Sequence, residues 1–311
     1  MKNFSYILMF IASVVWSLES TISAHVKITN LDGDVLYDTV MVVDYYEIDE
    51  SDESIDFVEY ISRHLEFDRY KDKSFYIEIK EKSDSELRPS YVTSYMNGKK
   101  HGIEKWYDKS GQLFIETPYI NGKIHGVRKS YSESGQLDIE IPYINGEAHG
   151  VGKGYYESGQ LSIEEPYVNG KKHGIEKKYS ESGQLEIERP FVNDKRHGIE
   201  KRYYESGQLL WEKPFVNDKR HGIGKGYYKS GQLRWEIPFV NDKIHGIEKW
   251  YDESGQLRDA TPFVNGKIHG IRKEYNNKGE VISTAKYKNG VLDGFKRCSN
   301  GKFGNENLKC Y

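Results

Sequence analysis

The sequence is poor in the residues that mark several large classes of protein. Its 311 residues include two cysteines, four methionines and eight prolines. Two cysteines are too few for a disulfide-dense scaffold or for a zinc site built on cysteine ligands. Mean hydropathy is −0.76 and only 37% of the residues are hydrophobic, which is low for an enzyme with a large core. The net charge of −3 gives no general argument for nucleic-acid binding, and none is expected.

Aromatic residues and glycine are abundant instead. Aromatic residues make up 14% of the chain, with 25 tyrosines, and there are 30 glycines. Disordered chains are usually poor in aromatic residues, so this composition excludes a mainly disordered chain. Tyrosine is common in strands and glycine in tight turns, so the composition favours β-structure with many turns.

A hydrophobic run long enough to span a membrane is also missing. The longest apolar run, from Phe4 to Leu18, follows Lys2 and precedes a polar segment. It is shorter than the roughly 20 residues of a transmembrane helix, and this order is typical of a secretory signal peptide. We therefore expect residues 1–24 to be a signal peptide, cleaved after Ser23 or Ala24, and the protein to be secreted, periplasmic or at the cell surface. An uncleaved anchor and a buried first strand are the alternatives.

A 24-residue repeat fills most of the chain. Asn97 recurs with this spacing, followed by glycine or, in three repeats, by aspartate, and so do His101-Gly102 and Ser-Gly-Gln-Leu from Ser110 onwards. Each repeat is expected to hold two strands and two turns. Gly135 suits the left-handed position of a three-residue hairpin loop, and side-chain parity favours a three-residue loop at the Asn-Gly turn as well. The predicted fold is all-β: an elongated, twisted antiparallel β-meander of hairpin repeats.

The segment from Tyr167 to Tyr179, followed by Glu-Ser-Gly-Gln-Leu, resembles the MORN-repeat variant found in bacterial proteins labelled as YwqK-like antitoxins. The resemblance covers about two-thirds of the chain. It implies an array of β-hairpins used for protein contacts and sometimes for membrane association. It implies no catalytic residues and no cofactor. The expected signal peptide argues against a cytoplasmic antitoxin.

The two ends differ from the repeat array, which we place at residues 94–297. Residues 25–93 hold 18 acidic and 8 basic residues, a net charge of −10, whereas the array has a net charge of +6. We expect residues 25–93 to form a small acidic cap with strands at 40–43 and 75–79 and a short helix at 55–65, because repeat arrays need polar caps. Residues 298–311 form the C-terminal cap. There, Cys298 and Cys310 are expected to form a disulfide, the alternative being two free thiols.

The polar residues of the repeats favour neither a metal site nor an active site. Histidines 24 residues apart lie two strands, or roughly 9–10 Å, from one another, too far to share one zinc ion unaided. Glutamates from Glu116 to Glu236 recur in six repeats, which is typical of a structural position. We therefore predict no catalytic residue, no metal and no enzymatic activity.

The best candidate for recognition is a row of lysines. Under the predicted register, Lys201, Lys225 and Lys249 alternate along one face with Trp211 and Trp235, which replace isoleucine in two adjacent repeats. Such a row would bind an acidic protein, an anionic glycan or lipid headgroups. The alternative is that the lysine stems only cover the apolar row. The leading hypothesis is an exported, non-enzymatic scaffold that binds another protein; glycan or lipid-headgroup binding comes second, and antitoxin-like neutralisation third.

Overall fold

The computed structural model describes residues 21–30, 35–44, 75–83, 86–108 and 110–310. Every regular element in these ranges is a strand, and the pairings are antiparallel. The all-β meander predicted from the repeat is therefore confirmed. The described ranges contain no helix that is long and apolar enough to cross a membrane. The chain divides near Gly126 into two compact units, unit 1 before this residue and unit 2 after it.

Unit 1 begins with a four-stranded antiparallel arrangement in which β1 pairs with β2 and β3, and β3 pairs with β4. Strands β2 and β3 confirm the two strands predicted in the acidic segment. The predicted helix at 55–65 and most of the predicted signal peptide lie outside the described residues. The strands of this unit are β1 (Thr21–Asn30), β2 (Val35–Asp44), β3 (Phe75–Ser83), β4 (Glu86–Met96), β5 (Lys99–Lys100), β6 (Gly102–Tyr107), β7 (Leu113–Ile120) and β8 (Lys123–Ile124).

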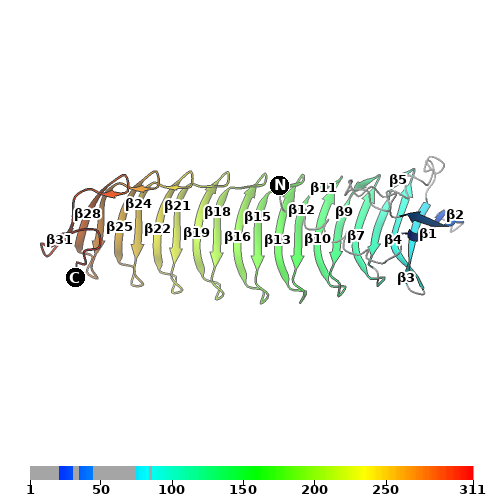
Figure 1. Ribbon diagram of the computed structural model, residues 1–311, viewed down its shortest axis with the longest axis horizontal. Coiled ribbons are helices and arrows are strands. Elements are labelled where there is room, and N and C mark those ends of the chain that lie inside the picture. The colour runs from blue at the N-terminus through cyan, green and yellow to red at the C-terminus, as the bar shows by residue number, and fades with distance from the viewer. Residues whose placement is uncertain (1–20, 31–34, 45–74, 84–85, 109, 311) are drawn as a thin grey trace. The chain divides into compact units, whose positions relative to one another are not determined.

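In unit 2 each repeat contributes a two-residue strand, a six-residue strand and an eight-residue strand, and the strands follow one another in chain order (Figure 1). The six-residue strands are β9 (Gly126–Tyr131), β12 (Gly150–Tyr155), β15 (Gly174–Tyr179), β18 (Gly198–Tyr203), β21 (Gly222–Tyr227), β24 (Gly246–Tyr251) and β27 (Gly270–Tyr275). The eight-residue strands are β10 (Leu137–Ile144), β13 (Leu161–Val168), β16 (Leu185–Val192), β19 (Leu209–Val216), β22 (Leu233–Val240), β25 (Leu257–Val264) and β28 (Val281–Lys288).

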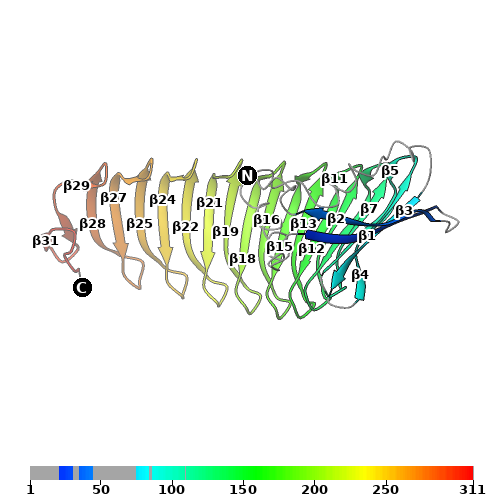
Figure 2. The same ribbon diagram turned by 45° about the vertical axis from the view of Figure 1, so that its right-hand side comes forward.

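The remaining strands are short. Most of them flank the turns that contain asparagine, and the turns gather on two opposite edges of the sheet in unit 2 (Figure 2). The short strands are β11 (Glu147–Ala148), β14 (Lys171–Lys172), β17 (Lys195–Arg196), β20 (Lys219–Arg220), β23 (Lys243–Ile244), β26 (Lys267–Ile268), β29 (Val291–Leu292), β30 (Lys296–Cys298) and β31 (Phe303–Gly304).

The turn at Ser158-Gly159 has the predicted three-residue form. Tyr156 N donates to Gln160 O at 2.8 Å across the loop, and Gly159 has φ +81°, a conformation that glycine adopts without strain. The pairing then shifts, because Tyr155 lies opposite Leu161 while Gly154 lies opposite Ile163. One extra residue, Ser162, therefore forms a β-bulge directly after this turn.

The Asn-Gly turn differs from the prediction. Ile144 pairs with Glu147, so the loop contains only Asn145 and Gly146, both with positive φ, as a type I′ turn requires. From the next pair, Tyr143 with Ala148, the pairing moves three residues back to Glu140 on one strand, but five residues forward to Lys153 on the other. Two residues are thus inserted near His149-Gly150, and the three-residue loop predicted from parity is wrong.

These insertions decide which side chains share a face. We call the side of unit 2 that carries Lys153, Glu164 and their equivalents the ladder face. The opposite side, which carries Ile163, Tyr167 and their equivalents, is the aromatic face. The most deeply buried side chains of the repeats lie on the aromatic face, among them Phe215 and Phe239, with 6% and 5% of their surface exposed.

Candidate binding surfaces

The ladder face has a row of lysines and glutamates that pair directly across neighbouring strands. Glu140 lies opposite Lys153, which lies opposite Glu164, and the same alternation continues through Lys249. The charged groups come within ion-pair distance at Lys153–Glu140 (3.5 Å), Lys201–Glu188 (3.9 Å) and Lys249–Glu236 (3.6 Å). The positive charges of the row are therefore largely balanced by the glutamates between them.

Tyrosines complete this row. Tyr203 Oη donates a hydrogen bond to Glu188 at 2.7 Å, and Tyr227 Oη donates to Glu212 at 3.0 Å. The pKa of each of these tyrosines is raised to about 12. The largest cause is partial burial, and the hydrogen bond to the glutamate and the glutamate's negative charge add to it. Each glutamate of the row thus holds a neighbouring phenol in its neutral form. The equivalent donors are Tyr155, Tyr179 and Tyr251.

The lysines and tryptophans predicted to form one site lie on opposite faces. Lys201 and Lys225 both pair with Glu212, whereas Trp211 pairs with Arg202 and Gly226. Lys249 likewise pairs with Glu236, and Trp235 pairs with Gly226 and Trp250. Because directly opposed residues point to the same side of a sheet, Lys201, Lys225 and Lys249 are on the ladder face and Trp211 and Trp235 are on the aromatic face. The predicted alternating row of lysine and tryptophan is therefore wrong.

The cation that accompanies the two tryptophans is Lys213, which sequence reasoning missed. Its Nζ lies 4.3 Å from the centroid of the Trp211 ring and 5.8 Å from that of Trp235. Lys213 is two residues from Trp211 along a strand, and period-two spacing was the signal that would have found it. Arg196 and Arg220 also lie on the aromatic face, 4.2 Å from the Phe215 ring and 4.4 Å from the Phe239 ring.

Two rows of aliphatic side chains on the ladder face are exposed, close to the Asn-containing turns. One row follows the glycine that begins each six-residue strand, and its members Ile199 and Ile223 are 49% and 54% exposed. The second row ends the eight-residue strands, with Val216 at 41%. Ile223 lies opposite Pro238, two residues from Val240, so the rows are diagonal neighbours. The exposed members are Val127, Val151, Ile175, Ile199, Ile223, Ile247 and Ile271, and Ile144, Val168, Val192, Val216, Val240 and Val264; we call them the aliphatic band.

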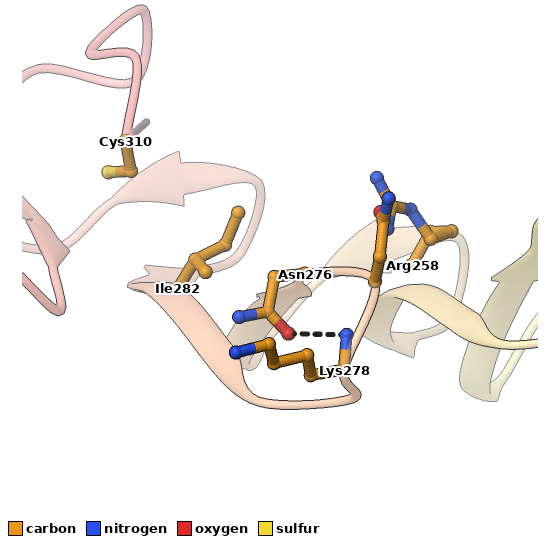
Figure 3. Close-up of a pocket in the computed structure, with 6 residues that line it drawn as sticks. Arg258, Asn276, Lys278, Ile282 and Cys310 are labelled. Atoms are coloured by element: carbon orange, nitrogen blue, oxygen red, sulfur yellow. Dashed lines mark hydrogen bonds between the residues drawn. The ribbon is translucent and has the colours of Figure 1, made fainter.

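A small hollow lies beside the C-terminal disulfide. It has a volume of about 340 Å³ and is lined by Arg258, Asn276, Asn277, Lys278, Ile282 and Cys310 (Figure 3). Asn276 Oδ1 accepts the backbone N–H of Lys278 at 2.9 Å, which is an ordinary turn contact. Cys298 and Cys310 are joined as predicted, with their Cα atoms 5.3 Å apart. Among the described residues, no group of three or more metal-ligating side chains is arranged to hold a metal ion.

The repeated hairpins coincide with segments of the sequence that match a known repeat family. Eight consecutive segments match the MORN repeat variant, and together they cover more than half of the chain. The chain belongs to the MORN repeat variant family. Each match runs from one short strand to the asparagine of the next turn, so a MORN repeat here is one hairpin with its connecting turn. The matched residues are 100–121, 124–145, 148–169, 172–193, 196–217, 220–241, 244–265 and 268–289. A search of curated proteins finds no match for the chain.

Proposed function

We propose that this MORN repeat variant protein is a non-enzymatic, exported scaffold that binds another protein along the ladder face of unit 2. The observation that carries the proposal is the aliphatic band. Its isoleucines and valines recur in consecutive repeats and remain about half exposed. Monomeric soluble proteins rarely leave a contiguous apolar patch larger than a few hundred Å² uncovered, and larger patches typically mark protein interfaces.

The chemistry of the band favours a protein over an anionic ligand. Its members are branched aliphatic side chains, which supply apolar area but no charge. Lys201 and Lys249, on the same face, stand beside glutamates at ion-pair distance. Lys219 and Lys243 lie opposite Val216 and Val240 at the edge of the band. A partner with a complementary apolar strip and a polar rim fits this combination, since interfaces typically have an apolar centre surrounded by polar groups.

A glycan or lipid-headgroup site is the second candidate carried over from the sequence. Aromatic platforms suit such ligands, but Trp211 and Trp235 lie on the aromatic face with Lys213, away from the exposed band. Lys219 and Lys243, opposite the valine row, supply cations for such a ligand, but the side chains of the band beside them are aliphatic and not aromatic, so we give this candidate second place. We propose no enzymatic reaction, because the polar residues are repeated and not unique. Positions such as Glu188 and Glu212 recur every 24 residues and form the same contacts in successive repeats.

Export is part of the proposal for two reasons. The apolar segment from Phe4 to Leu18 has the pattern of a signal peptide. The disulfide between Cys298 and Cys310 is the second reason, because disulfides persist mainly in oxidising compartments outside the cytoplasm.

The experiment compares proteins captured by the parent and by a band variant, Ile199→Glu with Ile223→Glu. Both side chains are about half exposed, so the glutamates remain hydrated in the free protein, but burying them in an interface costs desolvation energy. The matched control is Ser206→Glu with Ser230→Glu, which introduces the same charges in the same two repeats, within exposed turns. Captured proteins are quantified by mass spectrometry from extracts of the source cells and their surroundings.

The proposal expects at least one protein that the parent and the control retain equally and that the band variant loses by about tenfold or more, a difference of roughly 1.4 kcal/mol. Unfolding curves of all three proteins should coincide within about 0.5 kcal/mol, as for exposed substitutions. If the parent and the band variant capture the same proteins in equal amounts, the aliphatic band is not the binding surface.

A further inference from the structure

Part of the aromatic face carries a compact network of paired charges. Glu176 and Glu200 are only 2% and 6% exposed. Glu176 accepts from Lys172 at 3.1 Å and from Arg189 at 2.9 Å. Glu200 lies 3.2 Å from Arg189 and 3.6 Å from Arg196. Each buried carboxylate is thus held between a cation four residues earlier and Arg189, which lies on the strand between the two glutamates.

The following repeat keeps the cations but lacks the carboxylate. Lys213 and Arg220 occupy the positions of Arg189 and Arg196, one repeat further along, while Gly224 stands where Glu200 stands. Within the described part of the chain, Arg220 keeps only its pair with Asp242, near the turn, at 3.1 Å, which is equivalent to the pair of Arg196 with Asp218. Lys213 contacts the two tryptophan rings. Glu200 lies opposite Lys213 across the strands, but among the described residues no carboxylate comes within ion-pair distance of Lys213.

The consequence is visible when Lys213 is compared with Lys172. Burial acts against the charge of both lysines, but hydrogen bonds to Glu165 and Glu176 raise the pKa of Lys172 above its ordinary value. For Lys213, burial and the positive charge of Arg220 together lower the pKa, and Glu200 offsets this only in part. The site around Lys213 is therefore short of negative charge.

Gly224 is not required by the backbone. It is not among the glycines with positive φ, so other residues fit its conformation. A Cβ at this position would lie 3.3 Å from Phe239, 3.4 Å from Lys213 Cγ and 3.5 Å from Trp235. The space that a glutamate side chain would enter is thus bordered by the lysine stem and two aromatic rings.

A second glycine at the same repeat position provides an internal comparison. Gly152 is also buried within its strand, but Ile141 and Ala148 stand at the positions that Lys213 and Arg220 occupy beside Gly224. A Cβ at Gly152 would meet Tyr167 and Ile141 at 3.3 and 3.4 Å. Both repeats lack the glutamate. At Gly224 this leaves Lys213 and Arg220 without the carboxylate found one repeat earlier, whereas Gly152 has no such cations beside it.

We propose that Lys213, Arg220 and Gly224, with Trp211 and Trp235, form a binding site for a carboxylate side chain of an acidic peptide. The carboxylate takes the place that Glu200 fills one repeat earlier, between the cations at the two equivalent positions. The tryptophan rings contact the apolar part of the peptide. The network around Glu176 and Glu200 shows that this scaffold holds a carboxylate at this position, which favours a carboxylate over a sulfate or phosphate group. The site lies on the opposite face from the aliphatic band, so a negative result for this site leaves the proposed function unaffected, and the reverse also holds.

The test is calorimetric titration of the full chain with a capped oligoglutamate peptide at low salt, with a capped oligoglutamine peptide and a sulfated oligosaccharide as comparisons. Tryptophan fluorescence gives a second readout of the same titrations. We expect saturable binding of oligoglutamate, no binding of oligoglutamine and weaker binding of the sulfated oligosaccharide. Lys213→Gln should weaken oligoglutamate binding about tenfold or more.

Gly224→Glu is the most informative variant, because it supplies the missing carboxylate from the chain itself. It should abolish oligoglutamate binding while the far-ultraviolet spectrum and the thermal midpoint remain close to those of the parent. Gly152→Glu adds the same group at the equivalent position without the cations and should bind like the parent. If Gly224→Glu does not fold, Lys213→Gln against Gly152→Glu decides the question.

Three results overturn the proposal: a parent protein that does not bind oligoglutamate, variants Lys213→Gln and Gly224→Glu that bind it as the parent does, or tighter binding of the sulfated oligosaccharide than of oligoglutamate. The last result would assign the cations to a different class of ligand. A loss of binding in Gly152→Glu equal to that in Gly224→Glu also counts against it, because the effect would then be one of charge anywhere on the aromatic face.

Discussion

Trp211 and Lys225 lie on opposite faces of the sheet although their strands are hydrogen-bonded neighbours. Trp211 is paired with Gly226, and Lys225 is paired with Glu212, the residue next to Trp211. One face of unit 2 therefore presents a row of balanced charges and an aliphatic band, while the other collects aromatic rings with Lys213 and the arginines. The two faces have separate chemistry, and we assign them separate binding roles.

The first prediction concerns the contact between Trp235 and Gly226. A Cβ at Gly226 would lie 2.1 Å from the Trp235 ring, so Gly226→Ala must displace the ring. We expect a loss of about 1–3 kcal/mol in the free energy of unfolding, as for other overpacked sites, together with a shift in tryptophan emission. Urea unfolding followed by fluorescence measures both.

Trp235→Ile in the Gly226→Ala background is the matched rescue. Isoleucine stands at the equivalent position 187, between Lys178 and Arg202, so it tolerates side chains on its neighbours. The double variant should recover most of the lost stability relative to Trp235→Ile alone. Unchanged stability and emission in Gly226→Ala would contradict the close position of the Trp235 ring over Gly226.

The sequence was sufficient to predict the repeat, the strands, the glycine turn and the disulfide. Each of these depends on local signals: a fixed 24-residue spacing, residues such as Gly159 that suit a left-handed turn, and a cysteine pair close in sequence. The strands β2 and β3 were recognised from short runs of β-branched and aromatic residues.

The faces were not predicted, because parity arguments assume uninterrupted strands. Ser162 adds one residue after the glycine turn, and the His149-Gly150 region adds two. A bulge of one residue moves all later side chains to the other face. Leu161 therefore shares a face with Tyr155, whereas Ile163 does not, although the sequence alternates regularly through both. The Asn-Gly pair is a common sequence of two-residue type I′ turns, a local signal that the parity argument overrode, and the positive φ of Gly150 marks the insertion that follows the turn.

The second prediction concerns the titration of the tyrosines on the ladder face. The pKa values of Tyr155, Tyr179, Tyr203, Tyr227 and Tyr251 are raised to about 12, from an ordinary value of about 10, by burial and by their glutamate partners. Since the folded state favours the neutral phenol, the stability these groups contribute is present below about pH 10 and is lost as the pH rises towards 12.

Absorbance of tyrosinate against pH measures this directly. The native protein should show a group of tyrosines that ionise about two pH units later than the rest. Glu212→Gln should lower the pKa of Tyr227, which donates its hydrogen bond to Glu212, and to a smaller extent that of Tyr203, because it removes a negative charge near both phenols. A single transition of all tyrosines near pH 10 would show that these hydrogen bonds do not form.

The third prediction concerns the N-terminus of the mature protein. Cleavage near Ala24 would remove the first residues of β1 and leave His25–Asn30, which pair with β3 from His25–Lys80 to Asn30–Phe75. The strand should therefore survive processing. Intact-mass measurement on protein isolated from its native compartment should give a chain that starts at residue 24 or 25. A cytosolic protein that starts at Met1 would contradict export.

The most direct test of the proposed scaffold function is site-specific photocrosslinking from the two faces. A photoreactive phenylalanine analogue replaces Ile223 in the aliphatic band, and in a second protein it replaces Ile163, which belongs to the aromatic face and lies outside the site proposed around Lys213. After illumination in the native compartment, we predict a discrete covalent adduct with another protein from position 223 and none of that size from position 163. Adducts that form only from position 163, or equally from both positions, would contradict a partner bound along the ladder face.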